Sequence, residues 1–300
     1  MQDILTCAMG LDIHRDVIVA CLAKGELGTD PEIEIRSFST LIPEMRKLRD
    51  WVLEAECRYV AMESTGIYWQ PIYEMLEPCF DGQINILVVN DRHMKNVPGR
   101  KTDMRDAQWI ATLLRAGLLK GSFIPDKTFR ELRHLTRYRK SIVRDITAQK
   151  NRIDKFLQSS GFRFTAFLSD AFGASGRNII RHLMEYGNIS REALDRCLKT
   201  QTRKRIDEIL IALNGSLSEH QRGFLRMIFG HLEALEQHRH TVEDAITKEI
   251  TKHEEALSLL CSIPGIDVTA AAAIIAEIGT DMSAFPDSQH ICSWAGLSPG

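Results

Sequence analysis

The first third of the chain alternates short apolar runs with amphipathic stretches, a pattern that predicts a mixed α/β domain. Two amphipathic segments, about 43–54 and 68–78, have the periodicity of helices. Five segments have the apolar content or the alternation of β-strands: 8–13, 16–23, 32–38, 59–62 and 84–89. Three strands followed by helix, strand, helix and strand is the element order of a ribonuclease-H-like, or RuvC-like, sheet.

The rest of the chain has helical periodicity and predicts an all-α region. From Thr128 to Ser159, apolar residues recur at helical spacing among basic ones. A second long helix is predicted around six apolar positions: Leu225, Ile228, Leu232, Leu235, Val242 and Ile246. Because these steps fit a heptad seam, we expect the two long helices to pair as an antiparallel coiled coil. Segment 161–221, between them, predicts a small helical insertion.

Residues 260–271 have the form of a helix-hairpin-helix turn. In such a turn, the hairpin at Pro264 and Gly265 would present backbone N–H groups at the start of the following helix to a phosphate, without contacting bases. The second helix would end at Gly279. However, Asp267 stands where these turns usually have a second glycine, and its charge would repel a phosphate. A nucleic-acid contact and a purely structural hairpin therefore both stay open.

Composition narrows the class of protein. No run of eighteen apolar residues occurs, and the N-terminus lacks the basic region of a signal peptide, so we expect a cytoplasmic protein. The seven cysteines show no C-x-x-C spacing. This argues for reduced thiols and against a zinc site or a disulfide framework.

Charge is distributed unevenly along the chain. Between Arg92 and Arg163, 18 Lys and Arg face 6 Asp and Glu, a surplus of +12, while the whole chain carries −2. Such a block is typical of a nucleic-acid contact surface, although a solvated helix face is the alternative. The predicted contacts in this block are Arg100, Lys101, Arg105, Arg133, Arg137, Lys140, Arg144, Lys150, Arg152 and Lys155.

Four acidic residues mark the ends of predicted strands or the start of a predicted helix: Asp12, Glu63, Asp103 and Asp106. That helix is expected to begin at Thr102 as N-cap and to run to about Leu119. Its two acids, three residues apart, share one face. Carboxylates gathered in this way can hold two divalent ions about 4 Å apart for attack on a phosphodiester, and hard oxygen ligands suit Mg²⁺ or Mn²⁺.

Simpler interpretations exist for single members of this set. A strand-end aspartate such as Asp12 is common in turns, and a Gly-x-Asp start also opens the phosphate loop of sugar kinases. The kinase hypothesis further requires a glycine-rich adenosine-binding loop and a second Asp-Gly turn that binds phosphate, and no segment is identified as either. A helix dipole favours an acid in the first turn and would explain one of Asp103 and Asp106, but not both.

Six short motifs occur in order at the two ends of the chain: Gly10-Leu11-Asp12, Glu63-Ser64-Thr65-Gly66, Lys101-Thr102-Asp103-x-x-Asp106-Ala107, Ile263-Pro264-Gly265-Ile266, Glu277-Ile278-Gly279 and Trp294-Ala295-Gly296-Leu297-Ser298-Pro299-Gly300. Together they resemble the IS110 family of DEDD transposases of bacterial mobile elements, which includes Piv-type DNA invertases. The middle of the chain does not contribute to the resemblance.

The resemblance implies an organisation and a set of partners. It implies a RuvC-like metal-binding domain at 1–125, dimerising coiled-coil helices at 126–160 and 222–256 around the insertion at 161–221, and a C-terminal transposase domain at 257–300. It also implies that the four acids bind Mg²⁺. The implied partners are donor and target DNA, a structured noncoding guide RNA, and further copies of the chain in a homodimer or larger oligomer.

In the family that the chain resembles, a serine of the C-terminal domain attacks the DNA phosphate. Its position lies beyond Gly300, and Ser298 does not match it, so we expect the nucleophile outside these 300 residues. The predicted function is that of a DNA transposase or site-specific recombinase. The alternatives are a nucleic-acid-binding module without a nucleophile, and a RuvC-like metal-dependent nuclease or junction resolvase that uses activated water.

Overall fold

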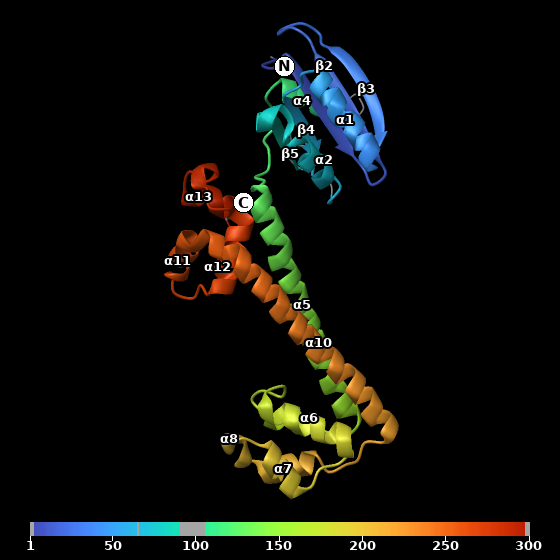
Figure 1. Ribbon diagram of the computed structural model, residues 1–300, viewed down its shortest axis with the longest axis vertical. Coiled ribbons are helices and arrows are strands. Elements are labelled where there is room, and N and C mark those ends of the chain that lie inside the picture. The colour runs from blue at the N-terminus through green and yellow to red at the C-terminus, as the bar shows by residue number, and fades with distance from the viewer. Residues whose placement is uncertain (1–2, 65, 91–105, 298–300) are drawn as a thin grey trace. The chain divides into compact units, whose positions relative to one another are not determined.

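The computed structural model describes residues 3–64, 66–90 and 106–297. The chain divides into two compact units, Met1–Ile124 and Pro125–Gly300 (Figure 1). Among the helices described, none combines the length and the apolar character needed to cross a membrane.

The N-terminal unit is built on a mixed sheet. Its described strands are β1 Cys7–Ile13, β2 Val17–Lys24, β3 Glu32–Ser39, β4 Tyr59–Glu63 and β5 Asn85–Val89. Their spatial order is β3-β2-β1-β4-β5, with β2 antiparallel to β1 and β3, and β4 parallel to β1 and β5 (Figure 1). This arrangement confirms the ribonuclease-H-like fold, and no strand end lies more than one residue from its predicted position.

Helices cover both faces of this sheet. Helices α1 (Ile42–Glu54) and α2 (Trp69–Leu76) and the 3₁₀ turn η1 (Cys79–Gly82) pack on one face, against apolar side chains that include Met9 and Leu11. Helix α4 (Asp106–Arg115) packs on the other face. Because successive strand residues point to opposite faces, the even-numbered positions of β1 face α4.

Gly10 lets α4 lie directly on β1. A Cβ added at Gly10 would stand 2.2 Å from the carbonyl oxygen of Ala107 and 2.4 Å from the backbone nitrogen of Ala111. No side chain fits that gap, so only glycine allows the helix to approach this closely.

Helix α4 ends earlier than predicted, at Arg115 rather than near Leu119. Gly117 adopts a left-handed backbone conformation, with φ of +67°. Its N–H donates to the carbonyl of Leu114 (2.9 Å), and the N–H of Leu118 donates to the carbonyl of Leu113 (2.9 Å). These bonds satisfy carbonyls of the last helical turn, as in other glycine-terminated helices. The predicted N-cap Thr102 lies outside the described residues.

Arg115 ties this helix to the rest of the N-terminal unit. Its side chain is 2% exposed and lies 3.1 Å from the Asp3 carboxylate. It donates hydrogen bonds to the carbonyl oxygens of Leu5 (3.0 Å), Gly25 (3.3 Å) and Glu26 (2.8 Å). A buried charge is tolerated only with such partners, so Arg115 fixes the chain before β1 and the β2–β3 connection to the end of α4.

The second unit is helical, and two long helices form its axis, α5 (Lys127–Ser159) and α10 (Glu219–Ile250) (Figure 1). They run antiparallel, since Gln149 bonds to the carbonyl of Ile228 (2.6 Å) while Arg139 bonds to Glu243 (2.8 Å). Apolar side chains at helical spacing on both helices belong to one buried cluster. Helix α10 starts at a capping box between Ser218 and Gln221, in which each side chain bonds to the backbone N–H of the other residue.

Shorter helices pack at each end of this pair. The segment between α5 and α10 contains η2 (Phe164–Phe167), α6 (Ala174–Tyr186), α7 (Arg191–Cys197), α8 (Thr200–Arg203) and α9 (Ile206–Ala212). After α10 come η3 (Thr251–His253), α11 (Glu254–Cys261), α12 (Val268–Ile278), η4 (Met282–Ala284) and α13 (Ser288–Trp294). Helix α12 packs on the first half of α5, because Ala272, Ile275 and Ala276 share the buried cluster with Phe129 and Leu132.

Candidate functional site

Strand register places Asp12 and Glu63 next to each other at one edge of the sheet. Strands β1 and β4 are parallel neighbours, and Leu11 pairs with Met62. The next residue of each strand is the acidic one, so both acids stand where their strands end. Ala8 and Ala61 pack toward α4, and alternation puts Asp12 and Glu63 on the same face.

Helix α4 brings a third acid to this edge. Its first described residue is Asp106, and the next, Ala107, lies against Gly10, two positions before Asp12. Its last residue, Arg115, bonds to the chain just before β1. The helix therefore runs opposite to β1, and its first described turn lies at the edge where Asp12 lies. Asp103, the fourth predicted member, lies outside the described residues.

The Asp12 side chain is 14% exposed, and its Oδ2 lies 3.2 Å from Nε2 of His14, which is 59% exposed. His14 follows the end of β1 and turns back toward the acid two residues before it. Sequence reasoning missed this neighbour because it considered only metal-ligand spacings among histidines. The available signal was the Asp-x-His spacing at a strand end.

The donor chemistry of this edge suits a hard divalent cation. Asp12, Glu63 and Asp106 offer carboxylate oxygens, the ligands that Mg²⁺ and Mn²⁺ prefer. Within the described ranges, no three or more His, Cys, Asp or Glu side chains are grouped closely enough to hold a metal ion. The described residues thus fit such a cation by their donor type and by their common edge, but they do not form a complete ligand set.

Two of the predicted nucleic-acid contacts bind the chain's own α12. Arg137 forms a two-point pair with the Glu277 carboxylate, at 2.8 and 2.9 Å. Arg133 donates to the backbone carbonyl of Glu277 (2.7 Å), and its Nε lies 3.0 Å from the same carboxylate. Burial lowers the pKa of the Arg133 guanidinium, an effect that Glu277 opposes. These two arginines therefore hold the end of α12 on α5.

The other predicted contacts on α5 differ in their surroundings. Lys150 lies 4.0 Å from Glu236, and Arg152 donates to Gln149. Lys140, Arg144 and Lys155 are exposed and have neither an ion-pair partner nor a side-chain hydrogen bond in the part of the chain that the structure describes. Arg100, Lys101 and Arg105 lie outside the described residues.

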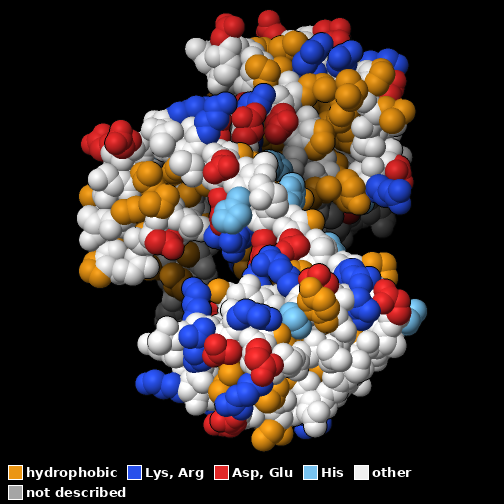
Figure 2. Space-filling view, turned by 60° about the horizontal axis from the view of Figure 1, so that its bottom comes forward, with side chains coloured by type: hydrophobic (Ala, Val, Ile, Leu, Met, Phe, Trp, Pro, Cys, Tyr) orange, Lys and Arg blue, Asp and Glu red, His pale blue; other side chains and the backbone are white. Residues whose placement is uncertain are grey.

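Paired charges also cover the short helices of the second unit. Figure 2 shows Lys and Arg mixed with Asp and Glu over the surface, rather than gathered in one large patch of a single sign. Among the pairs are Arg205 with Glu208 (2.8 Å) and Arg203 with Asp195 (2.9 Å). The insertion therefore presents a mixed surface, and the unpaired cations of α5 are the better candidates for phosphate contacts.

The C-terminal hairpin joins α11 to α12, and both Pro264 and Gly265 are exposed there. Gly265 has a φ of +91°, which explains the glycine. Asp267 is the N-cap of α12, and its carboxylate accepts the N–H of Ala270 at 2.7 Å. An N–H that could have bound a phosphate is thus satisfied within the chain.

Comparisons with known proteins agree with this arrangement. A model described as a transposase, for DEDD transposases of the IS110 type, matches residues 9–161, and a model of the transposase IS116/IS110/IS902 family matches residues 257–300. An uncharacterized 43.6 kDa protein of insertion element IS110 from Streptomyces coelicolor is 28% identical over 222 residues. That match covers 67% of this chain and 53% of the relative, so the chain spans about half the length of the curated relative it matches.

Proposed function

The chain belongs to the IS110 family of DEDD transposases, and we propose that it acts as a DNA transposase or site-specific recombinase of a mobile element. One observation carries the proposal. Asp12 and Glu63 lie side by side on one face of the sheet, at the ends of adjacent parallel strands, and Asp106 is the first described residue of the helix that covers this face. In open sheets of this kind, ligands bind at the carboxyl ends of the strands.

The acidic edge would hold Mg²⁺ or Mn²⁺ through Asp12, Glu63 and Asp106, together with Asp103. Bound divalent ions supply electrostatic stabilisation of the charge that develops on a phosphodiester. The chain's own contribution is to position the carboxylates. The register of β1 and β4 fixes two of them, and the contact of α4 with Gly10 fixes the helix that carries the third.

Finer parts of the proposal follow from membership of the family. We propose that a serine of the C-terminal transposase domain attacks the DNA phosphate, and that a structured noncoding RNA pairs with donor and target DNA. The domain limits of 1–125 and 257–300, and dimerisation through α5 and α10 as a coiled coil, belong to the same proposal. The exposed, unpaired cations of α5 support a nucleic-acid partner, since they can contact phosphates.

The test is strand exchange between donor and target DNA in the presence of RNA transcribed from the noncoding DNA beside the gene. We expect exchange to require Mg²⁺ or Mn²⁺, and Asp12→Asn and Glu63→Gln each to lower its rate by about 100-fold or more. Asp16→Asn is the matched control, because this side chain lies in the turn after β1 and is 86% exposed. Unchanged exchange in Asp12→Asn would show that the acidic edge is not the active site.

A metal-dependent nuclease is the second candidate, because the acidic edge lies entirely within the N-terminal unit and its chemistry does not need a serine. This function predicts nicked DNA with free ends and no covalent link between protein and DNA. Denaturing gels of radiolabelled DNA separate the two candidates, since a transposase that uses serine leaves a protein-linked strand.

A further inference from the structure

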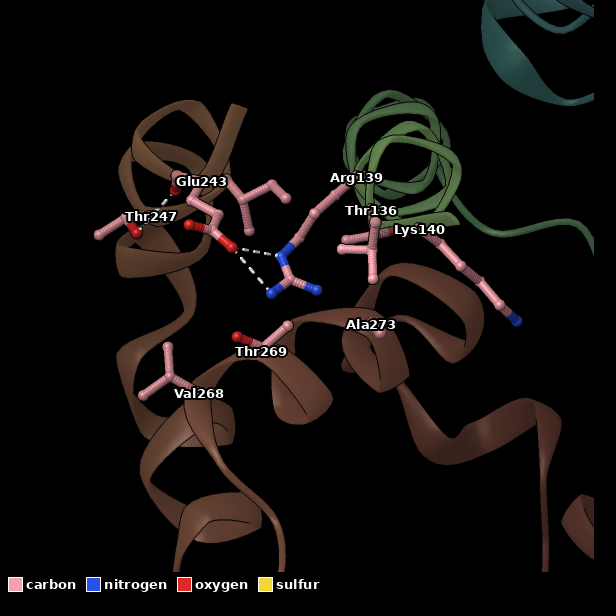
Figure 3. Close-up of a pocket in the computed structure, with 10 residues that line it drawn as sticks. Thr136, Arg139, Lys140, Glu243, Thr247, Val268, Thr269 and Ala273 are labelled. Atoms are coloured by element: carbon pink, nitrogen blue, oxygen red, sulfur yellow. Dashed lines mark hydrogen bonds and ion pairs between the residues drawn. The ribbon is translucent and has the colours of Figure 1, made fainter. Parts of the chain in front are cut away.

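A pocket of about 460 Å³ opens between α5, α10 and α12 in the helical unit (Figure 3). Its size is within the range of small-ligand sites. It lies beside the start of α12, immediately after the hairpin. No step of the proposed reaction uses it.

Polar groups of two helices meet in this pocket. The guanidinium of Arg139 reaches across to Glu243 and donates to Oε1 from both Nε and Nη2, each at 2.8 Å (Figure 3). The other terminal nitrogen of Arg139 has no partner among the described residues, and the Glu243 carboxylate also lies 3.7 Å from Arg239 and 3.5 Å from His240. The pocket therefore presents hydrogen-bond donors beside a carboxylate acceptor. Nucleobase edges carry the same two kinds of group, and guanidinium and carboxylate groups recognise them.

Apolar side chains form the rest of the wall. Val143 of α5 and Val268 of α12 are 36% and 52% exposed, which is unusual for valines on packed helices. Ala273, one helical turn further along α12, also lines the pocket. Apolar walls around a few polar groups suit an unstacked aromatic ring.

The chemistry just outside the pocket suits a phosphate backbone. Lys140 lines the pocket, extends away from the Arg139–Glu243 pair, and has no ion-pair partner among the described residues; Arg144 follows one turn later on α5. A free phosphate fits the pocket itself poorly, because it would meet the Glu243 carboxylate. Donors and acceptors inside with cations outside match a whole nucleotide better than an isolated anion.

We propose that this pocket receives one unpaired nucleobase of a nucleic-acid strand whose phosphates contact Lys140 and Arg144. This inference rests on the proposed function, which makes nucleic acid the partner. It adds the residues that distinguish an unpaired nucleotide from a paired one: Arg139 and Glu243 contact the base edge, and Val143, Val268 and Ala273 enclose the ring.

The experiment compares hairpins with and without a single bulged 2-aminopurine, made both as RNA and as DNA. We expect a bulged hairpin to bind about tenfold more tightly than its fully paired counterpart, the size of effect that one or two net hydrogen bonds to the base edge supply. The fluorescence of the 2-aminopurine reports its environment in the complex. Whichever bulged form, RNA or DNA, binds more tightly identifies the source of the base.

Two variants fill the pocket from different helices, Ala273→Phe on α12 and Val143→Trp on α5. In each variant, the bulged and the fully paired hairpin should bind with about equal affinity. Leu259→Phe is the matched control, because this side chain is 71% exposed on α11 and does not line the pocket. Circular dichroism checks that each variant is folded. Because the two substitutions lie on different helices, the test can still be made if one variant does not fold.

Equal binding of bulged and paired hairpins would overturn the inference and leave the proposed function intact. So would a preference that survives both filling variants. A short apolar peptide that binds the wild-type protein and not Val143→Trp, without any bulge preference, would assign the pocket to a protein segment instead. Failure to bind any hairpin would count against the proposed function itself.

Discussion

The N-terminal sheet and the helical unit place their charged side chains in different ways. In the sheet, Asp12 and Glu63 stand at the ends of adjacent parallel strands, where the backbone alone brings them together. In the helical unit, acids such as Glu243 and Glu277 lie on helix faces and bind basic residues of α5. The first arrangement gathers like charges, for which we propose a divalent cation, and the second neutralises charge within the fold.

This difference changes the meaning of the basic block between Arg92 and Arg163. Several of its cations bind acids from outside that window: Arg115 binds Asp3, Arg133 and Arg137 bind Glu277, Arg139 binds Glu243, and Lys150 approaches Glu236. Acidic residues of the protein itself therefore neutralise part of the positive charge of this block. The net charge of a segment overstates a nucleic-acid surface when its partners are distant in sequence.

The largest stability effect is expected at Arg115, a charged residue of the sheet unit whose role is structural. Arg115→Ala would leave buried carbonyls and the Asp3 carboxylate without their donor, and should lower the free energy of unfolding by about 3–5 kcal/mol. Urea denaturation measures the change. Arg49 is the control, because its side chain is 37% exposed and pairs, among the described residues, with its neighbour Asp50; its alanine variant should change stability by less than about 1 kcal/mol. A similar small loss for Arg115→Ala would contradict the structural role.

Gly10→Ala tests whether the contact between α4 and β1 sets the acidic edge. The added methyl would overlap the backbone at Ala107, so we expect a loss of about 1–3 kcal/mol in stability. Strand exchange should fall further than the folded fraction does, because the shifted helix carries Asp106. Gly230→Ala is the control, since that position in α10 has open space around it and should gain up to about 1 kcal/mol. A normal rate of strand exchange in folded Gly10→Ala would show that the position of α4 does not set the acidic edge.

The pair of Arg137 and Glu277 tests whether charges of the helical unit stabilise the fold. Their side chains are 64% and 31% exposed, so solvent weakens the interaction. A double-mutant cycle with both alanine variants should give a coupling energy of about 0.5–1 kcal/mol. The pair of Arg181 and Glu233 is similarly exposed but has one hydrogen bond in place of two, and should give less. Coupling near zero for both pairs would leave α12 held by its apolar contacts alone.

The smallest effect concerns Asp287, the N-cap of α13. Hydrogen bonds from the side chain and the backbone N–H of His290 hold the pKa of this carboxyl below its ordinary value of 3.8. A depressed pKa in the folded state means that the stabilisation is present above the unfolded-state pKa and is lost as the pH falls through the folded-state pKa. Carboxyl NMR should therefore detect titration of Asp287 at a lower pH than an ordinary aspartate, together with fraying of α13. Titration of the Asp287 carboxyl at the pH of an ordinary aspartate would contradict its role as the N-cap of α13.

Much of the fold could be predicted from the sequence because it depends on local periodicity. Alternation and apolar runs located the strands to within one residue, and the same bounds placed Asp12 and Glu63 at strand ends. Helical spacing located α5 and α10. The identity of the candidate site followed from these positions, since the carboxyl ends of parallel neighbours meet at one edge. Asp103 stays a prediction.

Only the tertiary structure decided which distant groups meet. The sequence showed that Arg133, Arg137 and Arg139 lie on a helix, but not that Glu277 and Glu243 bind them. It did not reveal that His14 turns toward Asp12, or that a pocket opens where α12 crosses α5 and α10. The physical reason is that periodicity reports which face of an element is buried, whereas the partner of a charge depends on how whole elements pack.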